Sequence, residues 1–244
     1  MTPATPVVVF TANDRPWCMT RVLDTWRNVR GIGAAHMIFQ CEPHDDMIDL
    51  ISEQARFAGE TEIRINGRQA GCEANTGIAL AAGFETGADF VVLGEDDGTV
   101  TSDLLEYMTW AAGRYQDDGD VFAVCTFQDA PPGPPDEVRR TDWFFPPVWG
   151  IWRDRWEALK DGWPQGHYEG RSWDWWMITR MRAAGQHVIQ SMATRSQQIG
   201  EYGTYQRGSL QDVWDKQQFT ADVPVQDGYR ELPGLWTSQG VPLR

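Results

Sequence analysis

The first half of the chain alternates between two hydrophobic patterns. Short apolar runs rich in β-branched residues, such as PVVVFTA, predict buried strands, and each is followed by a stretch with helical spacing of its apolar residues. The predicted strands lie at 6–12, 35–41, 61–65 and 88–94, and the predicted helices at 16–29, 45–57, 71–86 and 102–115, the last capped by Ser102. Successive strand–helix units indicate a parallel sheet covered by helices on both faces.

The second half of the chain is less regular. A predicted strand at 121–127 leads into the proline-rich stretch APPGPPDEV, which we interpret as a loop. The remaining predicted elements are an extended segment at 141–152, a short helix at 153–160 and a helix at 172–185 between a Ser172 cap and Gly185. The sequence shows no repeat and no linker. We therefore expect one Rossmann-like α/β domain with a mostly parallel central sheet over 1–220 (nucleotide-sugar half about 1–100, acceptor half about 101–205) and an extended C-terminal tail at 221–244.

Composition narrows the possible partners and compartment. The net charge of −14 disfavours a broad nucleic-acid surface, although the local pair Arg139 and Arg140 leaves a small contact open. The N-terminal stretch lacks a signal-peptide pattern, and no segment approaches the roughly 20 apolar residues of a membrane span. The four cysteines form no CxxC pair. We expect reduced core thiols in a cytoplasmic protein, of a microbial cell or a virus-infected host cell, without a membrane partner.

The candidate chemistry lies in VVLGEDDGTV, where a predicted strand runs into Glu95, Asp96 and Asp97. Three adjacent carboxylates repel one another, and ligands of parallel sheets bind at the carboxyl ends of strands. Neither a dinucleotide fingerprint nor a phosphate loop is present, and the spacing does not fit an EF-hand. Two interpretations stay open from these residues alone: an acidic solvated turn before the next helix, or a site where Mn²⁺ (or Mg²⁺) binds together with a diphosphate.

Longer stretches carry a resemblance to a known family. The block NTGIALAAGFETGADFVVLGEDD resembles the GT-A fold of glycosyltransferases, in which an acidic DxD-like motif binds the metal. Downstream, RRTDWFFPPVWGIWRDRWEAL and WPQGHYEGRSWDWWM resemble the RTDFFPGLGW-like and WPxxxWDDWM-like segments of the N-acetylglucosaminyltransferase I family. The matching pieces run in the same order from about residue 7 to 205. The resemblance implies a metal-dependent transferase that uses a nucleotide-sugar donor, with UDP as the expected nucleotide.

The resemblance also implies roles for single residues. FTANDRP is similar to the family segment that meets the nucleotide, and Cys41 stands where the family has an aspartate that reads uracil, with Glu42 next to it. Asn75 replaces a donor-facing histidine, and the acidic triplet supplies the ribose and sugar contacts and the metal ligand. The implied donor-binding residues are Ala12, Asp14, Arg15, Cys41, Asn75, Glu95 and Asp96, and the implied metal ligand is Asp97.

SWDWWM resembles the family's FWDDWM and implies that Asp174 is the catalytic base. The chemistry agrees, because an inverting transfer needs a carboxylate that takes the proton of the acceptor hydroxyl. The alternative is that Asp174 only favours the N-terminus of its helix. Many of the thirteen tryptophans cluster near this motif, and tryptophans form either core or flat platforms for sugar rings and bases. Trp149 and Trp173 are the predicted acceptor-binding residues.

SQQIGEYGTYQRG resembles the family's flexible loop that closes over the donor. Gly200 and Gly203 suit such a lid, and Gln198 and Tyr205 stand at candidate contact places. The sequence thus predicts an inverting, metal-dependent glycosyltransferase whose acceptor is a glycan, a protein or a hydroxylated nucleobase. A sugar-phosphate nucleotidyltransferase and a non-catalytic carbohydrate-binding protein with a relic site are the alternatives.

Overall fold

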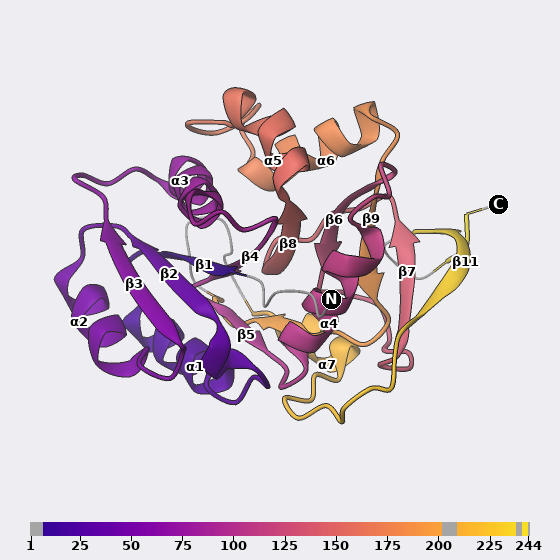
Figure 1. The fold of residues 1–244 in the computed structure, drawn as a ribbon, viewed down its shortest axis with the longest axis horizontal. Helices are drawn as coiled ribbons and strands as arrows, with labels where there is room; N and C mark the ends of the chain where they lie inside the picture. The colour runs from indigo at the N-terminus through magenta and orange to yellow at the C-terminus, as the bar shows by residue number, and fades with distance from the viewer. Residues whose placement is uncertain (1–6, 202–208, 238–240, 244) are drawn as a thin grey trace.

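A nine-stranded mixed sheet forms the centre of the protein (Figure 1), which is known from a computed structural model that describes residues 7–201, 209–237 and 241–243. The strand order is β11-β7-β9-β6-β8-β4-β1-β2-β3. Its strands are β1 (Val7–Ala12), β2 (His36–Cys41), β3 (Glu60–Ile65), β4 (Phe90–Glu95), β6 (Val121–Cys125), β7 (Glu137–Thr141), β8 (Val148–Trp152), β9 (His187–Ser191) and β11 (Arg230–Trp236). The strands β5 (Gly98–Val100) and β10 (Ser196–Gln198) pair antiparallel in a small second sheet.

The nucleotide-sugar half is built as the hydrophobic pattern predicts. β1 pairs in parallel with β2 and β4, so that Val9 lies between Ile38 and Leu93, and β2 pairs in parallel with β3. β1, β2 and β4 are buried on both faces, which is why they read as apolar runs, whereas the edge strand β3 is partly exposed. All first-half strands therefore direct their carboxyl ends to one edge, where the acidic triplet follows β4.

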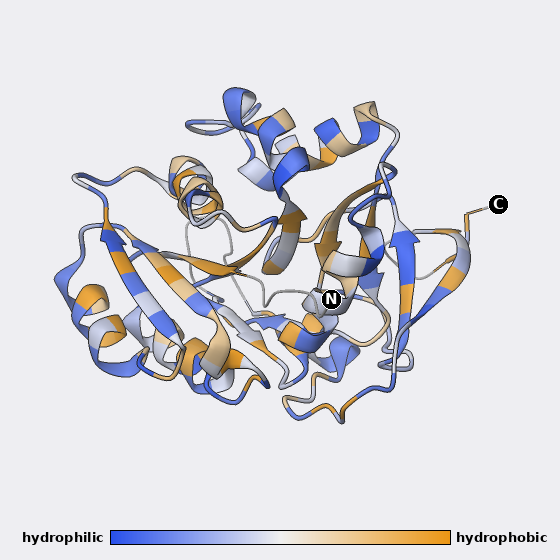
Figure 2. Ribbon diagram, in the orientation of Figure 1, coloured by the Kyte–Doolittle hydropathy of each residue, from blue (hydrophilic) through white to orange (hydrophobic). Residues whose placement is uncertain are grey.

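Helices cover both faces of the sheet, and Figure 2 shows hydrophobic residues concentrated along its central strands. The helices are α1 (Pro16–Trp26), α2 (Asp45–Gln54), α3 (Cys72–Glu85), α4 (Leu104–Tyr115), α5 (Arg153–Leu159), α6 (Trp173–Ala183) and α7 (Gln211–Gln217), with short 3₁₀ turns at Ile32–Ala34 and Lys160–Gly162. The core on one face joins α1, α2 and α4 to the sheet, and the core on the other joins α3, α5 and α6. The part of the chain that the structure describes contains no helix long and apolar enough to cross a membrane.

The small residues of α3 permit the close helix–sheet packing that the sequence predicts. A Cβ atom at Gly83 would lie 2.8 Å from Val9 Cγ1 and 2.9 Å from Val91 Cγ1. A Cβ atom at Gly77 would lie 2.6 Å from Cδ1 of Trp163. Glycine at these two positions therefore lets α3 approach the sheet on one side and the tryptophan-rich second half on the other.

Three local expectations differ from the structure. Ser102 does not cap α4, which begins at Leu104; its hydroxyl instead donates to Asp222 Oδ1 at 3.1 Å, tying a distant loop to this corner. β7 forms at the end of the stretch interpreted as a proline-rich loop. The residues expected as an extended tail contribute β11, which pairs in parallel with β7 at the edge of the sheet. These pairings join residues about a hundred positions apart, which local patterns do not encode.

Candidate active site

The acidic triplet lies where β4 ends. The guanidinium group of Arg15 forms ion pairs with two of its three carboxylates, Asp96 and Asp97. Arg15 follows β1 and donates from Nη1 to Asp97 Oδ2 at 2.8 Å, while its Nη2 forms an ion pair with Asp96 Oδ1. The backbone N–H of Asn13 donates to Asp96 Oδ2 at 3.0 Å. Because β1 and β4 are neighbours and parallel, the residues after both strands meet at one edge. Arg15 therefore offsets the repulsion that the sequence implies.

Burial makes this cluster electrostatically unusual. The pKa of Glu95 is raised well above its ordinary value by burial and by the charges of Asp97 and Asp96. Burial raises the pKa of Asp96 to about 6, although Arg15 acts in the opposite direction. Burial works to lower the pKa of Arg15, but the two aspartates outweigh it and raise the value above normal. The site thus favours an additional positive charge.

Asp97 has a carboxylate oxygen that makes no hydrogen bond and could therefore bind a metal ion. Its Oδ2 accepts from Arg15, whereas Oδ1 is buried without a hydrogen-bond partner. Within the described residues no group of three or more His, Cys, Asp or Glu side chains is arranged to hold a metal. These observations fit a hard cation that takes one oxygen from the protein and others from a diphosphate, as Mn²⁺ and Mg²⁺ do. Asp97 would hold it.

The segment after β10 lies directly over the acidic triplet. Ile199 donates its backbone N–H to the carbonyl of Asp97 at 2.9 Å. A Cβ atom at Gly200 would lie only 2.1 Å from Asp97 Oδ2 and 2.4 Å from Arg15 Nη1. Gln198, the last residue of β10, pairs with Gly98 in β5. Gly203 and Tyr205, the other residues of the predicted lid, lie outside the described residues.

The predicted donor-binding residue at the end of β2, Cys41, is buried, and its neighbour Glu42 contacts the loop before α3. Cys41 has no exposed surface and packs in the core with α1 and α2, where burial raises the pKa of its thiol to about 12. Its neighbour Glu42 is buried and accepts backbone N–H bonds from Ala70 at 2.9 Å and Gly71 at 2.8 Å. Strand alternation is the reason: when Cys41 faces the core, the next side chain faces the opposite way. Glu42 thereby fixes the loop that leads into α3.

The other predicted donor residues surround this loop or the end of β1. Asn75 is buried and accepts from Asn66 Nδ2 at 2.8 Å, while its own amide donates to the carbonyl of Gln40 at 3.2 Å. Ala12 is buried at the end of β1, and Asp14 is exposed beyond it. Their donor contacts stay predictions.

Asp174 belongs to the second half of the chain and lies near enough to the acidic triplet to act on it electrostatically. It lies in the first turn of α6, after Ser172 at the N-cap position, although the Ser172 side chain makes no capping bond. Its Oδ1 is buried without a hydrogen-bond partner. Burial raises the pKa of Asp174, against the backbone N–H groups at the helix start. Asp174 also lies near enough to Glu95 for its charge to help raise that residue's pKa.

The predicted acceptor tryptophans lie in the core. Trp149 is fully buried, Trp173 is 1% exposed, and their rings stack with centroids 5.6 Å apart. The half-exposed aromatic residues beside Asp174 are Trp143 and Trp175, which sequence reasoning did not select. A signal was available for one of them, because Trp175 occupies the position of the second aspartate in the family motif. The acceptor role of Trp149 and Trp173 stays a prediction.

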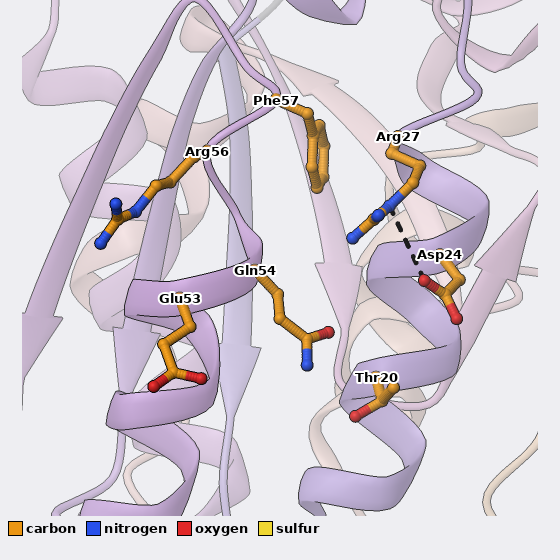
Figure 3. A pocket seen from close by; sticks show the side chains of 7 residues that line it. All are labelled: Thr20, Asp24, Arg27, Glu53, Gln54, Arg56 and Phe57. Atoms are coloured by element: carbon orange, nitrogen blue, oxygen red, sulfur yellow. Dashed lines mark ion pairs between the residues drawn. The ribbon is translucent and has the colours of Figure 1, made fainter.

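A surface hollow lies elsewhere. About 600 Å³ in volume, it lies between α1 and α2 and is lined by Thr20, Asp24, Arg27, Glu53, Gln54, Arg56 and Phe57 (Figure 3). Arg27 pairs with Asp24 at 3.7 Å and lies 5.8 Å from the Phe57 ring centroid. None of the predicted site residues lines it, so its size does not make it the active site.

The mostly parallel half-sheet, with the acidic triplet after β4, has the arrangement of the GT-A fold. Solved structures agree on the fold. The mannosyltransferase PcManGT from Pyrobaculum calidifontis, solved with GDP-Man and Mn²⁺, superposes with a TM-score of 0.52 at 14% identity over 77% of this chain and 57% of its own. TarS 1–349 of S. aureus, solved with UDP-GlcNAc, gives a TM-score of 0.57 at 12% identity over 86% of this chain and 64% of its own.

The chain belongs to the GNT-I family, whose profile matches residues 79–225. A curated relative, the alpha-1,3-mannosyl-glycoprotein 2-beta-N-acetylglucosaminyltransferase of Arabidopsis thaliana, is 27% identical over 119 residues. That match covers 47% of this chain and 26% of the relative, so the shared part is about a quarter of the relative's length.

Proposed function

We propose that this protein is an inverting, metal-dependent glycosyltransferase that moves a sugar from a nucleotide-sugar to a hydroxyl acceptor. The observation that supports the proposal most is that two carboxylate oxygens are buried without a hydrogen-bond partner, Asp97 Oδ1 after β4 and Asp174 Oδ1 at the start of α6. One suits a cation on the leaving diphosphate, and the other suits a proton from the acceptor. Family membership supports the same chemistry.

The donor would lie along the carboxyl ends of β1, β2 and β4. The loop held by Glu42 and the end of β1 would border its nucleoside, and Arg15, which pairs with Asp96 and Asp97, would lie next to the diphosphate. The neighbouring solved structures carry UDP-GlcNAc in one case and GDP-Man in another. UDP remains our expectation on the family resemblance, and the sugar is open.

In the proposed reaction Asp174 accepts the proton of the acceptor hydroxyl as its oxygen attacks the anomeric carbon. The new carbon–oxygen bond forms on one face while the bond to the diphosphate breaks on the other, and the nucleoside diphosphate leaves with the bonding electrons. One displacement of this kind inverts the anomeric configuration. The cation at Asp97 would neutralise charge on the departing diphosphate. A glycan, a protein or a hydroxylated nucleobase would provide the hydroxyl.

A direct test is the hydrolysis of UDP-sugars, measured as the release of UDP. It is measured in the presence of Mn²⁺, in excess chelator, and again after Mn²⁺ has been restored. We expect release with Mn²⁺ only, and a product of inverted anomeric configuration in NMR spectra. Full activity in excess chelator, or a product of retained configuration, would contradict the proposal. Pyrophosphate release from UTP and a sugar 1-phosphate would indicate the nucleotidyltransferase alternative instead.

A further inference from the structure

Four side chains next to Asp174 contact one another in a row: Arg171, Trp175, Trp143 and Arg182. We call this row the Trp–Arg ladder. The two indole rings meet edge-to-face, with centroids 5.4 Å apart and planes at 87°. The guanidinium carbon of Arg171 lies 3.9 Å from the Trp175 centroid, and that of Arg182 lies 5.2 Å from the Trp143 centroid. Both tryptophans are half-exposed and both arginines are exposed. The ladder is therefore a surface feature, unlike the buried tryptophans behind it.

A tight turn fixes the outer end of the ladder. Tyr168 and Arg171 exchange two backbone hydrogen bonds of 2.9 Å each. The two residues between them have positive φ, 50° at Glu169 and 75° at Gly170. Such a turn sets the backbone path of its closing residues, and α6 begins two residues later. The backbone of Arg171 is thus placed next to the start of α6.

The ladder adjoins the proposed catalytic base. Trp175 is the next residue after Asp174, and its backbone N–H supports the Asp174 carboxylate. The charge of Arg171 also reaches that carboxylate. A molecule that places its hydroxyl at Asp174 would therefore extend over the ladder.

The two arginines of the ladder differ in whether a carboxylate of the protein already pairs with them. Arg182 pairs with Asp142 at 3.4 Å. Arg171 has no carboxylate within ion-pair distance among the residues that the structure describes, although the chain carries a net charge of −14. One cation is therefore available to a ligand at this surface.

On the basis of the function proposed above, we propose that the Trp–Arg ladder is the acceptor subsite and that the acceptor is a sugar ring bearing one acidic group. The apolar face of a sugar can pack against the solvent-accessible part of the half-buried Trp175 indole. A carboxylate or phosphate on the ring would pair with Arg171 in a charge-assisted hydrogen bond. A ligand with many negative charges would not bind more tightly than one with a single charge. Arg171 can pair with one anionic group, and the net negative charge of the protein repels the others.

The test is binding of small sugars to the full chain in the presence of UDP and Mn²⁺, measured by saturation-transfer NMR titration. The probes are methyl glucuronide and glucose 6-phosphate as acidic rings, methyl glucoside as the neutral ring, and a single-stranded oligonucleotide with 5-hydroxymethylpyrimidine. We expect at least one acidic ring to bind about tenfold more tightly than methyl glucoside. The acidic probe that binds then identifies the group.

Three variants assign the binding to the ladder. Arg171→Gln should remove the tenfold preference for the acidic ring, and Trp175→Ala should weaken every sugar by about tenfold. Arg180→Gln is the matched control, since Arg180 is an exposed arginine of the same helix that lies over Trp176, outside the ladder. It should bind like the wild type. Because Arg171 is exposed, its variant decides the matter even if Trp175→Ala does not fold.

Three results would overturn the subsite: equal binding of acidic and neutral rings, equal losses in Arg180→Gln and Arg171→Gln, or tightest binding by the oligonucleotide. Thermal stabilisation of the wild type by UDP and Mn²⁺ is measured in parallel. A chain that binds UDP without this sugar pattern contradicts the acceptor subsite alone. A chain that binds neither UDP nor UDP-sugars contradicts the proposed function.

Discussion

Asp174 is the residue on which the proposed reaction depends most directly. Asp174→Asn keeps the size of the side chain and cannot accept a proton. Because general-base catalysis contributes about 10²–10⁴-fold, turnover should fall by that factor while affinity for UDP-sugar and melting temperature stay close to wild type. Steady-state kinetics with calorimetric donor binding checks both. If Asp174 only favours the helix N-terminus, the variant would instead lose up to about 1 kcal/mol of stability with turnover nearly intact.

The pH profile offers an independent check on the same residue. Asp174 must be ionised to act as a base, and burial raises its pKa. The acid limb of the turnover profile should therefore lie above the value of about 4 for an exposed aspartate. A profile that is flat down to that pH would assign the base to another group.

Asp97 is the residue that we expect to hold the cation. Asp97→Asn keeps the shape of the side chain but offers a neutral oxygen to the metal. A nucleotide present at 100 times its Kd stabilises a protein by about 2.7 kcal/mol, and we expect the Mn²⁺-dependent part of that stabilisation to disappear. Thermal melts with UDP, with and without Mn²⁺, measure it. The exposed Asp24→Asn is the matched control, and a full Mn²⁺-dependent shift in Asp97→Asn would show that the cation binds elsewhere.

The raised pKa of Glu95 should make the stability of the ligand-free protein depend on pH. Its pKa is raised in the folded protein, so the folded state binds a proton more readily than the unfolded state. The associated stability is complete below the unfolded pKa of about 4.3 and is lost as the pH rises through the folded pKa. Glu95→Gln should therefore raise the melting temperature at pH 7 and not at pH 4. Equal effects at both pH values would contradict the electrostatic explanation.

At the scale of elements, the contact between the segment after β10 and the acidic triplet depends on a missing side chain. A Cβ atom at Gly200 would collide with Asp97 and Arg15, and their ion pair prevents either from retreating freely. We expect Gly200→Ala to lower stability by about 1–3 kcal/mol, an overpacking effect measurable as a lower melting temperature. Gly228→Ala is the control, because a Cβ atom there meets nothing within 4 Å. Identical melting temperatures would mean that the segment moves away at little cost.

At the scale of the whole molecule, Glu231 joins the C-terminal strand to the rest of the fold. Its carboxylate accepts from Arg140 Nε at 2.6 Å and from the Tyr115 hydroxyl at 2.9 Å, so one side chain connects β11, β7 and α4. Glu231→Gln should cost about 0.5–1.5 kcal/mol, because the half-buried Arg140 loses one of its two carboxylates. Denaturant unfolding measures it against Glu157→Gln, which breaks only an exposed pair with Lys160. Equal losses would mean that β11 adds little to stability.

The sequence by itself determined the parallel half-sheet and the two motifs at which we propose that the chemistry takes place. Runs such as the one ending at Glu95 are long, apolar and β-branched, and the parallel order of the first strands follows from local alternation with helices. The acidic triplet and the SWDWWM motif could be recognised because their residue types are unusual at the ends of such elements. The GT-A fold and the GNT-I family followed from the same stretches.

Only the tertiary structure decided which side chains share the site. That Arg15 bridges Asp96 and Asp97, and that Asp174 lies near Glu95, depends on contacts across about eighty residues. Exposure was also undetermined, since a tryptophan-rich sequence does not say which rings are covered. The chain buries Trp149 and Trp173 and leaves Trp143 and Trp175 at the surface. One physical reason explains both findings. Strand pairing and the packing of helices on the sheet depend on contacts between distant segments, and a local sequence pattern does not specify which segments meet.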